Sequence, residues 1–469
     1  MRPSAACARP WARALALACA MLLAGCASVP DSAEREARAA QASQSADAAL
    51  DSYRRSQGIS ADPRTPKDDF LARHLAVEQA VSGAPLVPGN RVRLLADGPS
   101  TYRAMLQSIG QARRYVHMET YIFDDDTEGS RFADALIAAR ARAAEVSLMV
   151  DAIGTIKTPD ALFDRLRDAG VQVAVFNPVN PALARAGWSP NQRNHRKVLV
   201  VDGKVGYLGG LNVSSVYESS PGSSSGSGKS DAAAAGDART APWRDTHLRI
   251  EGPAVAELEA VIRTGWESQT KEPLKGGDAY VAPAAGDTSV RILANQPDRS
   301  DGYTVYLTLM SAFESAQKYI HITMAYFVPD PAFIDVLTAA ARRGVDVVLV
   351  LPGFSDSSLV FHAGRSHYAD LLEAGVKLYE RRDALLHAKT AVVDGVWSTV
   401  GSSNMDWRSF ALNYEINAVV LGPDFAGEME ALFQRDVADS VRITPEAWQA
   451  RGVKDRSMEF FSRMFERWL

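Results

Sequence analysis

Cysteine is almost absent from this sequence. Of its 469 residues only three are cysteines, and Cys7, Cys19 and Cys26 all lie at the beginning of the chain. The first two belong to an expected leader, which leaves Cys26 alone in a mature chain. We therefore expect no disulfide, although the chain would enter an oxidising compartment, and we exclude cysteine chemistry and cysteine-bound metal.

An excess of positive charge is also missing. The sequence has 51 Lys and Arg against 56 Asp and Glu, a formal net charge of −5. Removal of a leader that holds Arg2, Arg9 and Arg13 leaves 48 basic against the same 56 acidic residues, or −8. Proteins that bind duplex DNA are normally basic, so the composition argues against nucleic acid as a partner.

Long apolar runs are limited to the N-terminus. Residues 1–25 combine a basic start with an apolar stretch, Ala14 to Leu23, that is too short to span a bilayer and is typical of a secretory signal. The signal ends in Leu-Ala-Gly-Cys, which resembles the lipobox of bacterial lipoproteins; an ordinary cleavage site is the alternative. The resemblance implies lipidation at Cys26 and a membrane anchor. Ala27 and Ser28, rather than an Asp, come directly after Cys26, so we expect a periplasm-facing lipoprotein of the bacterial cell envelope, in the outer membrane, with the inner membrane as the alternative.

Three further segments differ in composition from the body of the chain. Residues 26–85 predict a tether with an N-terminal helical segment, and residues 218–242, rich in Ser, Gly and Ala, predict a disordered surface insertion. Residues 443–469 carry large apolar side chains at roughly helical spacing, interleaved with Arg and Glu. They predict one amphipathic helix, which either packs on the body or lies in a membrane interface.

The rest of the sequence repeats itself. Ala112 to Met118 (ARRYVHM) resembles Ala316 to Ile322 (AQKYIHI), and a helical stretch then matches at a constant offset. Each copy reads strand, helix, strand, helix, strand. Residues 86–275 and 276–442 are therefore expected to form two α/β half-domains with a largely parallel sheet.

The strongest signal occurs once in each copy. Residues 194–212 read NHRKVLVVDGKVGYLGGLN and residues 386–404 read LHAKTAVVDGVWSTVGSSN. Both place Lys two residues after His, Asp five residues after Lys and Asn seventeen residues after His. A lone histidine in a strand is usually structural, but two copies with identical spacing indicate catalysis.

The spacing predicts how the side chains of each motif meet. Alternate residues of a strand share a face, and Asp-Gly is a hairpin-turn signal. A two-residue turn sets His195 opposite Asn212 and Lys197 opposite Gly210. The second copy is paired alike: His387 with Asn404, and Lys389 with Ser402. One hairpin then presents a nucleophile, a fixed positive charge and a hydrogen-bond donor, which suit a phosphate group.

Two aspartates complete the motifs. Asp202 and Asp394 each directly precede the glycine of the turn. They count with the catalytic motif residues, but their position favours a structural role in holding the turn.

The paired motifs resemble the HxKxxxxD signatures of the phospholipase D superfamily, from about Val87 to about Leu469. The branch that looks most similar is that of the bacterial cardiolipin synthases. The supporting segments are GNRVRLLADG, HMETYIFDDDTEG, WRDTHLRIEGPAV and SNMDWRSFALNYE. The resemblance implies two α/β/α half-domains that form one pseudo-two-fold unit, with the active site at their interface.

The resemblance also implies a double displacement through a phosphohistidine, without metal or other cofactor. It assigns the nucleophile to His195 and the acid and base to His387. Four further motif residues would hold the phosphoryl oxygens and offset charge in the transition state: Lys197, Lys389, Asn212 and Asn404.

Each histidine would need a carboxylate to orient its far nitrogen. Glu415 lies twenty-eight residues beyond His387, where family members carry such a group. The matching position of the first copy falls in the insertion, so Asp245, just past it, is the expected substitute. Gly210 stands where the second copy has Ser402, and the first half would then lack one hydroxyl ligand to phosphate.

These observations favour a phosphatidyltransferase similar to cardiolipin synthase. It would join two phosphatidylglycerol molecules and release glycerol, or use phosphatidylethanolamine as the donor, with no obligate protein partner. The alternatives are a phospholipase D hydrolase that releases phosphatidic acid, a nuclease or other phosphodiesterase of the same superfamily, and an inactive membrane-binding scaffold.

Overall fold

The computed structural model describes residue 78 and residues 82–180, 189–218, 241–277, 280–297 and 303–466. The expected leader 1–25, the lipidation site Cys26, most of the tether and most of the insertion lie outside these residues. Within the described part, none of the helices is both long and apolar enough to cross a bilayer.

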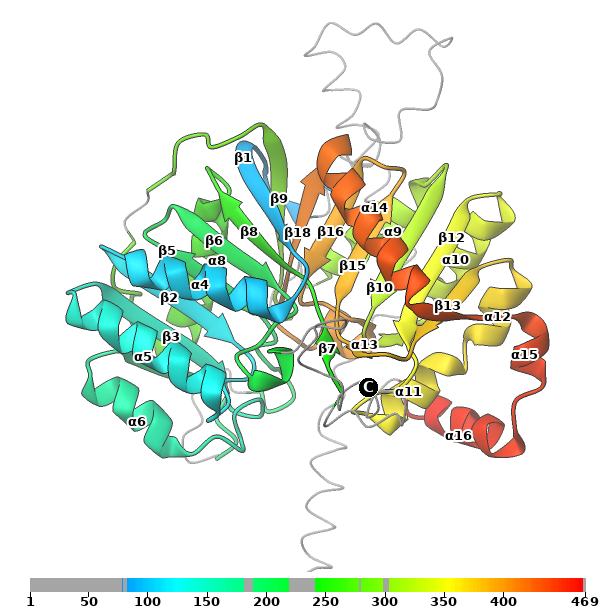
Figure 1. The fold of residues 1–469 in the computed structure, drawn as a ribbon, viewed down its shortest axis with the longest axis horizontal. Coiled ribbons are helices and arrows are strands. Elements are labelled where there is room, and N and C mark those ends of the chain that lie inside the picture. Colours follow the sequence, from blue (N-terminus) through cyan, green and yellow to red (C-terminus); the bar gives the residue numbers. More distant parts are fainter. Residues whose placement is uncertain are drawn as a thin grey trace, which may run out of the picture.

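Fifteen strands form one continuous sheet (Figure 1). The first half contributes, from the centre outward, β1 (Leu86–Leu95), β8 (His247–Glu251), β6 (Val205–Gly209), β5 (Val198–Val201), β2 (Tyr115–Thr120), β3 (Glu145–Asp151) and β4 (Gln172–Phe176). The second half contributes β9 (Thr288–Asn295), β18 (Glu415–Leu421), β16 (Trp397–Gly401), β15 (Lys389–Val393), β10 (Tyr319–Met324), β12 (Asp346–Pro352), β13 (Lys377–Arg381) and β19 (Ser440–Ile443).

The order of the strands shows the pseudo-two-fold symmetry that was expected. The two halves meet where β1 pairs with β9 in antiparallel fashion, Val87 opposite Val290. From this seam outward, each half repeats the same sequence of seven strands, and β19 is added at the far edge of the second half. The repeated α/β architecture is therefore confirmed.

The expectation of a largely parallel sheet is wrong. In the large sheet, parallel pairing is limited to two groups of three outer strands. One group is β2, β3 and β4, and the other is β10, β12 and β13. All other neighbours in the large sheet are antiparallel, because each motif adds a hairpin and each half adds two further strands beside the seam.

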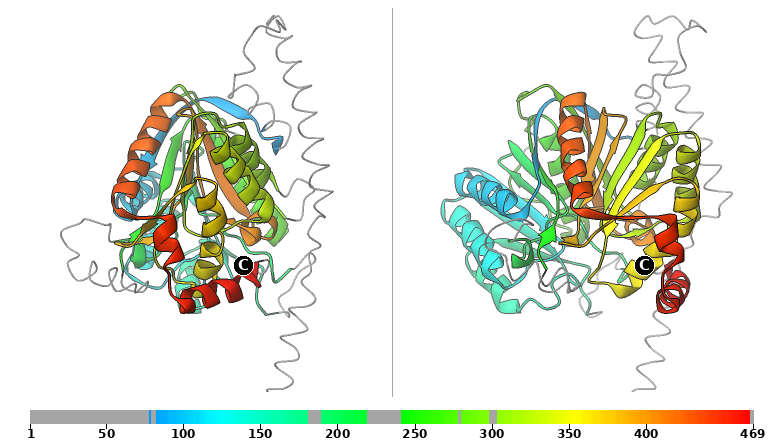
Figure 2. Two further views of the ribbon diagram at one scale, coloured as in Figure 1. Left: turned by 90° about the vertical axis from the view of Figure 1, so that its right-hand side faces the viewer. Right: turned by 45° about the vertical axis from the view of Figure 1, so that its right-hand side comes forward.

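Helices cover both faces of each half. Those of the first half are α4 (Gly98–Gln111), α5 (Thr127–Ala141), α6 (Asp160–Asp168) and α8 (Val255–Thr270). Those of the second half are α9 (Thr304–Ser315), α10 (Pro331–Arg342), α11 (Ser358–Arg365), α12 (Tyr368–Glu373), α13 (Trp407–Ala411) and α14 (Pro423–Ala438). Figure 2 shows α14 on one side of the second-half strands and α9 and α10 on the other.

Local sequence explains where several helices begin and what they bury. The side chains of Asp97, Asp126 and Asp330 accept hydrogen bonds from backbone N–H groups of the first turns of α4, α5 and α10, as N-cap residues do. The apolar faces of α4, α5 and α6 pack on β2, β3 and β5. In contrast, α8 and α14 share a single core that includes strands of both halves, which fixes the halves relative to each other.

The motif hairpins differ by one residue from the predicted register. Val198 lies opposite Leu208 and Val201 opposite Val205, so three residues rather than two connect β5 to β6. Asp202 and Gly203 have positive φ angles of 55° and 68°, and the next residue completes the turn. The second hairpin shows the same shift. The predicted pairings of the motif histidines with the motif asparagines are therefore wrong, and both residue types lie beyond the ends of the paired strands.

The C-terminal segment forms two short helices instead of one. These are α15 (Pro445–Gln449) and α16 (Val453–Arg463), separated at Ala450 to Gly452. Trp448 of α15 is buried against Tyr368 of α12, with ring centroids 4.9 Å apart.

Candidate active site

The two motifs meet where segments of the two halves cross. The backbone N–H of His195 donates to the carbonyl of Tyr414 in the second half at 2.9 Å. The N–H of His387 donates to the carbonyl of Arg244 in the first half at 2.8 Å. Directly before His387, β14 (Leu385–Leu386) runs parallel to β7 (Trp243–Arg244). The main chain of each half thus fixes the histidine of the other.

The orienting carboxylates are crossed in the same way. Nδ1 of His195 lies 3.0 and 3.1 Å from the two carboxylate oxygens of Glu415. Nδ1 of His387 lies 2.6 Å from Oδ2 of Asp245. Both carboxylates contact a histidine, and each contacts the histidine of the opposite half. Glu415 begins β18 and Asp245 precedes β8, and these strands flank the seam, so each carboxylate reaches across it.

Burial sets the protonation of the two histidines. It lowers the pKa of His195 to about 4, against a raising effect of Glu415 and together with a lowering effect of Lys197. Burial and the nearby Lys389 also lower the pKa of His387. Both imidazoles are therefore neutral near pH 7.

The carboxylates are ionised. Burial raises the pKa of Glu415, but the neighbouring His195 and Lys197 outweigh it and hold the pKa below its ordinary value. The pKa of Asp245 is lowered in the same way by the histidine and lysine of the second motif. An ionised carboxylate only accepts hydrogen bonds, so Nδ1 of each histidine carries the proton and Nε2 keeps a lone pair.

The motif lysines lie beside their histidines. Nζ of Lys197 donates to the carbonyl oxygen of His195 at 2.6 Å, and Lys389 donates to the carbonyl of His387. Burial lowers the pKa of Lys389 to about 8 and that of Lys197 well below its ordinary value. The charge of Lys389 also lowers the pKa of His195, so both motifs belong to one electrostatic site.

The Ser402 and Gly210 positions serve the carboxylates. The hydroxyl of Ser402 donates to Oε2 of Glu415 at 2.5 Å, so Ser402 orients that carboxylate. At Gly210, a Cβ atom would stand 2.1 Å from Oδ1 of Asp245. Gly210 therefore leaves the space that Asp245 occupies. The expectation that the first half lacks a hydroxyl ligand to phosphate is wrong, because the matching Ser402 contacts a carboxylate.

The two motif asparagines differ. The carboxamide oxygen of Asn212 accepts from the N–H of Ile122 at 3.1 Å, and its nitrogen donates to the Tyr217 hydroxyl at 3.1 Å. That hydroxyl lies 3.4 Å from Nδ1 of His387, so Asn212 supports the opposite histidine. Oδ1 of Asn404 is buried and has no hydrogen-bond partner among the described residues.

The motif aspartates lie at the far ends of the hairpins and are structural. The carboxylate of Asp202 accepts hydrogen bonds from three successive backbone N–H groups, of Arg113, Arg114 and Tyr115, at 2.7–3.2 Å. Asp394 accepts from three N–H groups at the start of β10 in the same way. Each joins its hairpin to the neighbouring strand, which fits the structural role that their position favours over a catalytic one.

Sequence reasoning missed the aromatic side chains around the histidines. The ring of Tyr121 lies 5.1 Å from that of His195, and the rings of Trp243, Tyr217 and Tyr326 lie 5.2, 6.0 and 6.4 Å from that of His387. A signal was available, because Tyr217 and Trp243 stand at the two ends of the insertion and Tyr121 follows the first repeated strand.

Comparison with known proteins agrees with this geometry. The sequence model of the family described as cardiolipin synthase, PLD-like domain, matches residues 105–217 and 309–437. The chain belongs to the cardiolipin synthase family of phospholipase D-type phosphatidyltransferases. A probable cardiolipin synthase of Bacillus subtilis is 33% identical over 80% of this chain and 72% of its own length.

Two further proteins extend this similarity. A cardiolipin synthase of Alkalihalophilus pseudofirmus is 35% identical to this chain, over 81% of this chain and 72% of the relative's own length. Among solved structures, the phosphatidylserine synthase of Haemophilus influenzae superposes with a TM-score of 0.61 at 12% identity, over 85% of this chain and 100% of that one. This second likeness shows that the two proteins share a fold.

Proposed function

We propose that this phosphatidyltransferase makes cardiolipin through a phosphohistidine on His195. The donor is phosphatidylglycerol or phosphatidylethanolamine, and the acceptor is phosphatidylglycerol. The observation that supports the proposal is the pair of neutral histidines, each held at Nδ1 by an ionised carboxylate of the opposite half. The reaction needs no metal or other cofactor.

In the first step, Nε2 of His195 attacks the phosphorus of the donor. The bond from phosphorus to the head-group oxygen breaks, and that oxygen takes a proton from Nε2 of His387. His387 takes part as the imidazolium, a form that the negative charge of the bound phosphodiester favours. Lys197, Lys389 and Asn404 offset the charge that develops on the phosphoryl oxygens.

In the second step, His387 removes the proton from the hydroxyl of the acceptor. The acceptor oxygen attacks the phosphorus of the phosphohistidine, the bond from phosphorus to Nε2 of His195 breaks, and the free enzyme returns. Water in place of the acceptor would give phosphatidic acid instead.

Lipid profiling in a cardiolipin-deficient bacterial host tests the proposal. The wild type and the control His321→Ala, a histidine paired with Glu430 away from the site, should both restore cardiolipin, and His195→Ala should not. Phosphatidic acid without cardiolipin would instead identify a hydrolase. No change in any lipid would refute phosphatidyl transfer.

We also propose that Cys26 anchors the protein in the cell envelope as a periplasm-facing lipoprotein of the outer membrane. The Leu-Ala-Gly-Cys sequence and the residues that follow it support this location. Radiolabelled palmitate should enter the wild type and not Cys26→Ser. Equal labelling of both, or recovery of the wild type in the inner membrane fraction, would contradict the anchor or its location, respectively.

A further inference from the structure

Helix α16 presents its large apolar side chains to solvent. Those most exposed are between 52% and 79% accessible: Val453, Phe460, Phe461 and Met464. The residues that α16 buries are polar, Glu459 and Ser462. This is the reverse of the usual surface helix of a soluble protein, whose apolar face points to the core.

Ion pairs hold the polar face of α16 on the body. Glu459 lies 2.9 Å from Arg451 and 3.6 Å from Arg365 of α11. Glu466, just beyond the helix, lies 3.3 Å from Nε2 of the buried His367. Because these contacts turn both glutamates inward and Asp455 is half-buried, the exposed side chains of α16 are apolar or basic, apart from Ser457.

The basic residues of α16 are on the exposed part of the helix: Lys454, Arg456 and Arg463. Apolar side chains flanked by lysine and arginine are the pattern of helices that lie in the interface of an anionic bilayer. In a symmetric dimer this basic face would meet the same basic face of a second copy, so charge favours an anionic lipid surface as its occupant.

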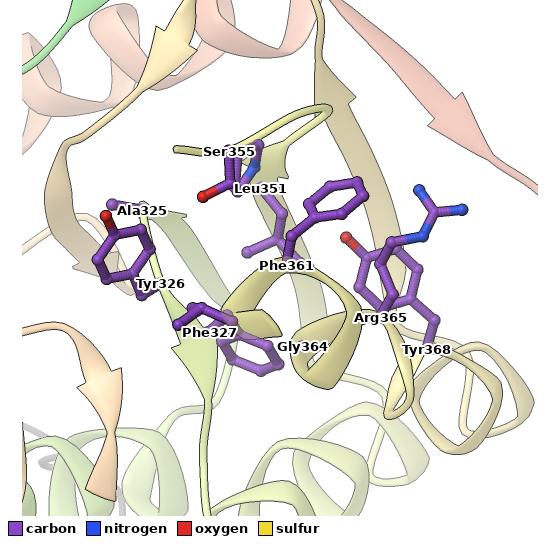
Figure 3. A pocket seen from close by; sticks show the side chains of 11 residues that line it. Ala325, Tyr326, Phe327, Leu351, Ser355, Phe361, Gly364, Arg365 and Tyr368 are labelled. Carbon is purple, nitrogen blue, oxygen red and sulfur yellow. The ribbon is translucent and has the colours of Figure 1, made fainter. Parts of the chain in front are cut away.

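The face is continuous with the active site of the second half. Helix α11, on which α16 packs, contributes Val360 and Phe361 to a pocket that Tyr326 also lines (Figure 3). The ring of Tyr326 lies 6.4 Å from that of His387. Figure 1 shows α11 and α16 at the lower right edge of the molecule, below and to the right of β7.

The first half has exposed apolar side chains in the corresponding place. Ile153 and Ile156, in the loop after β3, are 39% and 64% exposed. This loop packs closely on Tyr121, since a Cβ atom on Gly154 would stand 2.0 Å from the Tyr121 carbonyl oxygen. The ring of Tyr121 lies 5.1 Å from that of His195, so in each half an element with exposed apolar side chains packs beside an aromatic neighbour of a motif histidine.

We propose that α16 and the Ile153–Ile156 loop form an apolar rim that docks on an anionic phospholipid bilayer. The rim would hold the histidine pair at the lipid surface, where a phospholipid can reach it without leaving the bilayer entirely. The claim that the rim brings the histidine pair to its lipid substrate rests on the proposed function. The claim that the rim binds the bilayer does not.

Vesicle binding of catalytically inactive protein tests the rim separately from the chemistry. The full chain with His195→Ala and Cys26→Ser is sedimented with vesicles of phosphatidylcholine and phosphatidylglycerol in equal parts. Phe460→Ser, Phe461→Ser and Met464→Ser are then combined in one variant. The matched control replaces two exposed valines outside the rim, Val281 and Val441, with serine. All variants keep the leader, so the differences report the rim.

The combined variant should partition at least roughly tenfold more weakly than its parent, because three large side chains no longer enter the interface. The control should bind like the parent, and neutral vesicles should bind the parent more weakly. Unchanged binding by the combined variant, or an equal loss in the control, would overturn the proposal. A stable dimer of the parent that dissociates on combining the substitutions would also overturn the proposal, because the face would then be a dimer interface.

A kinetic measurement excludes a folding defect in the combined variant. With His195 and Cys26 restored, it should keep parental turnover of a short-chain, water-soluble phosphatidylglycerol and lose turnover of vesicle lipid. Equal turnover losses on both substrates would overturn the role of the rim, whereas inactivity of the parent on both would refute the proposed function and leave the binding result standing.

Discussion

Replacing Glu415 with Gln tests the crossed carboxylates in the most direct way. The two oxygens of Glu415 lie 3.0 and 3.1 Å from Nδ1 of His195, and Ser402 donates to one of them. Glutamine keeps the shape but removes the charge and offers an NH2 group. If that group donates to Nδ1, the proton of His195 moves to Nε2, the atom that must attack phosphorus.

The expected magnitude follows from the lost hydrogen bond. A hydrogen bond to a charged group contributes about 1.5–3 kcal/mol, and a tenfold rate change corresponds to about 1.4 kcal/mol. Glu415→Gln should therefore slow phosphoenzyme formation by roughly ten- to hundredfold. Asp245→Asn removes the same kind of bond from His387 and should slow the reaction by a similar factor, because without the carboxylate less of His387 is in the imidazolium form that protonates the leaving group.

A leaving group that departs without a proton separates the two effects. Phosphatidyl-p-nitrophenol needs no general acid, and rapid quenching measures the first turnover. On this substrate Asp245→Asn should recover to nearly the wild-type rate, and Glu415→Gln should stay slow. The opposite pattern would make His387 the nucleophile, and equal losses in both variants would refute the specific pairing of each carboxylate with one histidine.

Three further predictions concern acid and packing. Because burial lowers the pKa of His195 to about 4, phosphoenzyme formation from phosphatidyl-p-nitrophenol, which needs no acid from His387, should hold a constant rate on acidification until about pH 5 and then slow; half-loss near pH 6.5 would show an unshifted histidine. His117 is buried with a pKa lowered to about 4, so the unfolded chain binds its proton first. The stability it contributes is complete above about pH 6.5 and is lost as the pH falls, by up to roughly 3 kcal/mol near pH 4; urea unfolding of the wild type should show this loss, and His117→Gln should reduce it. Gly210→Ala should lower activity more than about tenfold by displacing Asp245, whose oxygen would stand 2.1 Å from the new Cβ. Gly427→Ala, with open space around it, is the matched control, and equal activity of the two variants would contradict the packing argument.

The sequence was sufficient to predict the elements that repeat and the residues of the motifs. The hydrophobic pattern and the two identical motif spacings are local features, and both can be seen in a single sequence. The crossed pairing could not be predicted, because it depends on β1 meeting β9 at the seam, a long-range contact. The one-residue error in the hairpins arises because the predicted two-residue turn, Gly203 and Lys204, leaves out Asp202, which also belongs to the connection between β5 and β6.

The C-terminal segment shows a second limit of sequence patterns. Apolar residues at helical spacing predicted one amphipathic helix, but the pattern does not tell which face a helix buries. Trp448 packs inward on α12, whereas the apolar residues of α16 point outward because ion pairs of Glu459 hold its other face. Partners distant in sequence, such as Arg365, decide the orientation.

The crossed carboxylates also bear on when the enzyme becomes active during its synthesis. His195 is made first, and the group that orients it, Glu415, follows 220 residues later in the chain. A ribosome must therefore add both the rest of the first half and most of the second before the first histidine has its partner. Incomplete chains that carry the first motif alone would lack an oriented nucleophile. Such unfinished chains would therefore not cleave the phospholipids of the membrane.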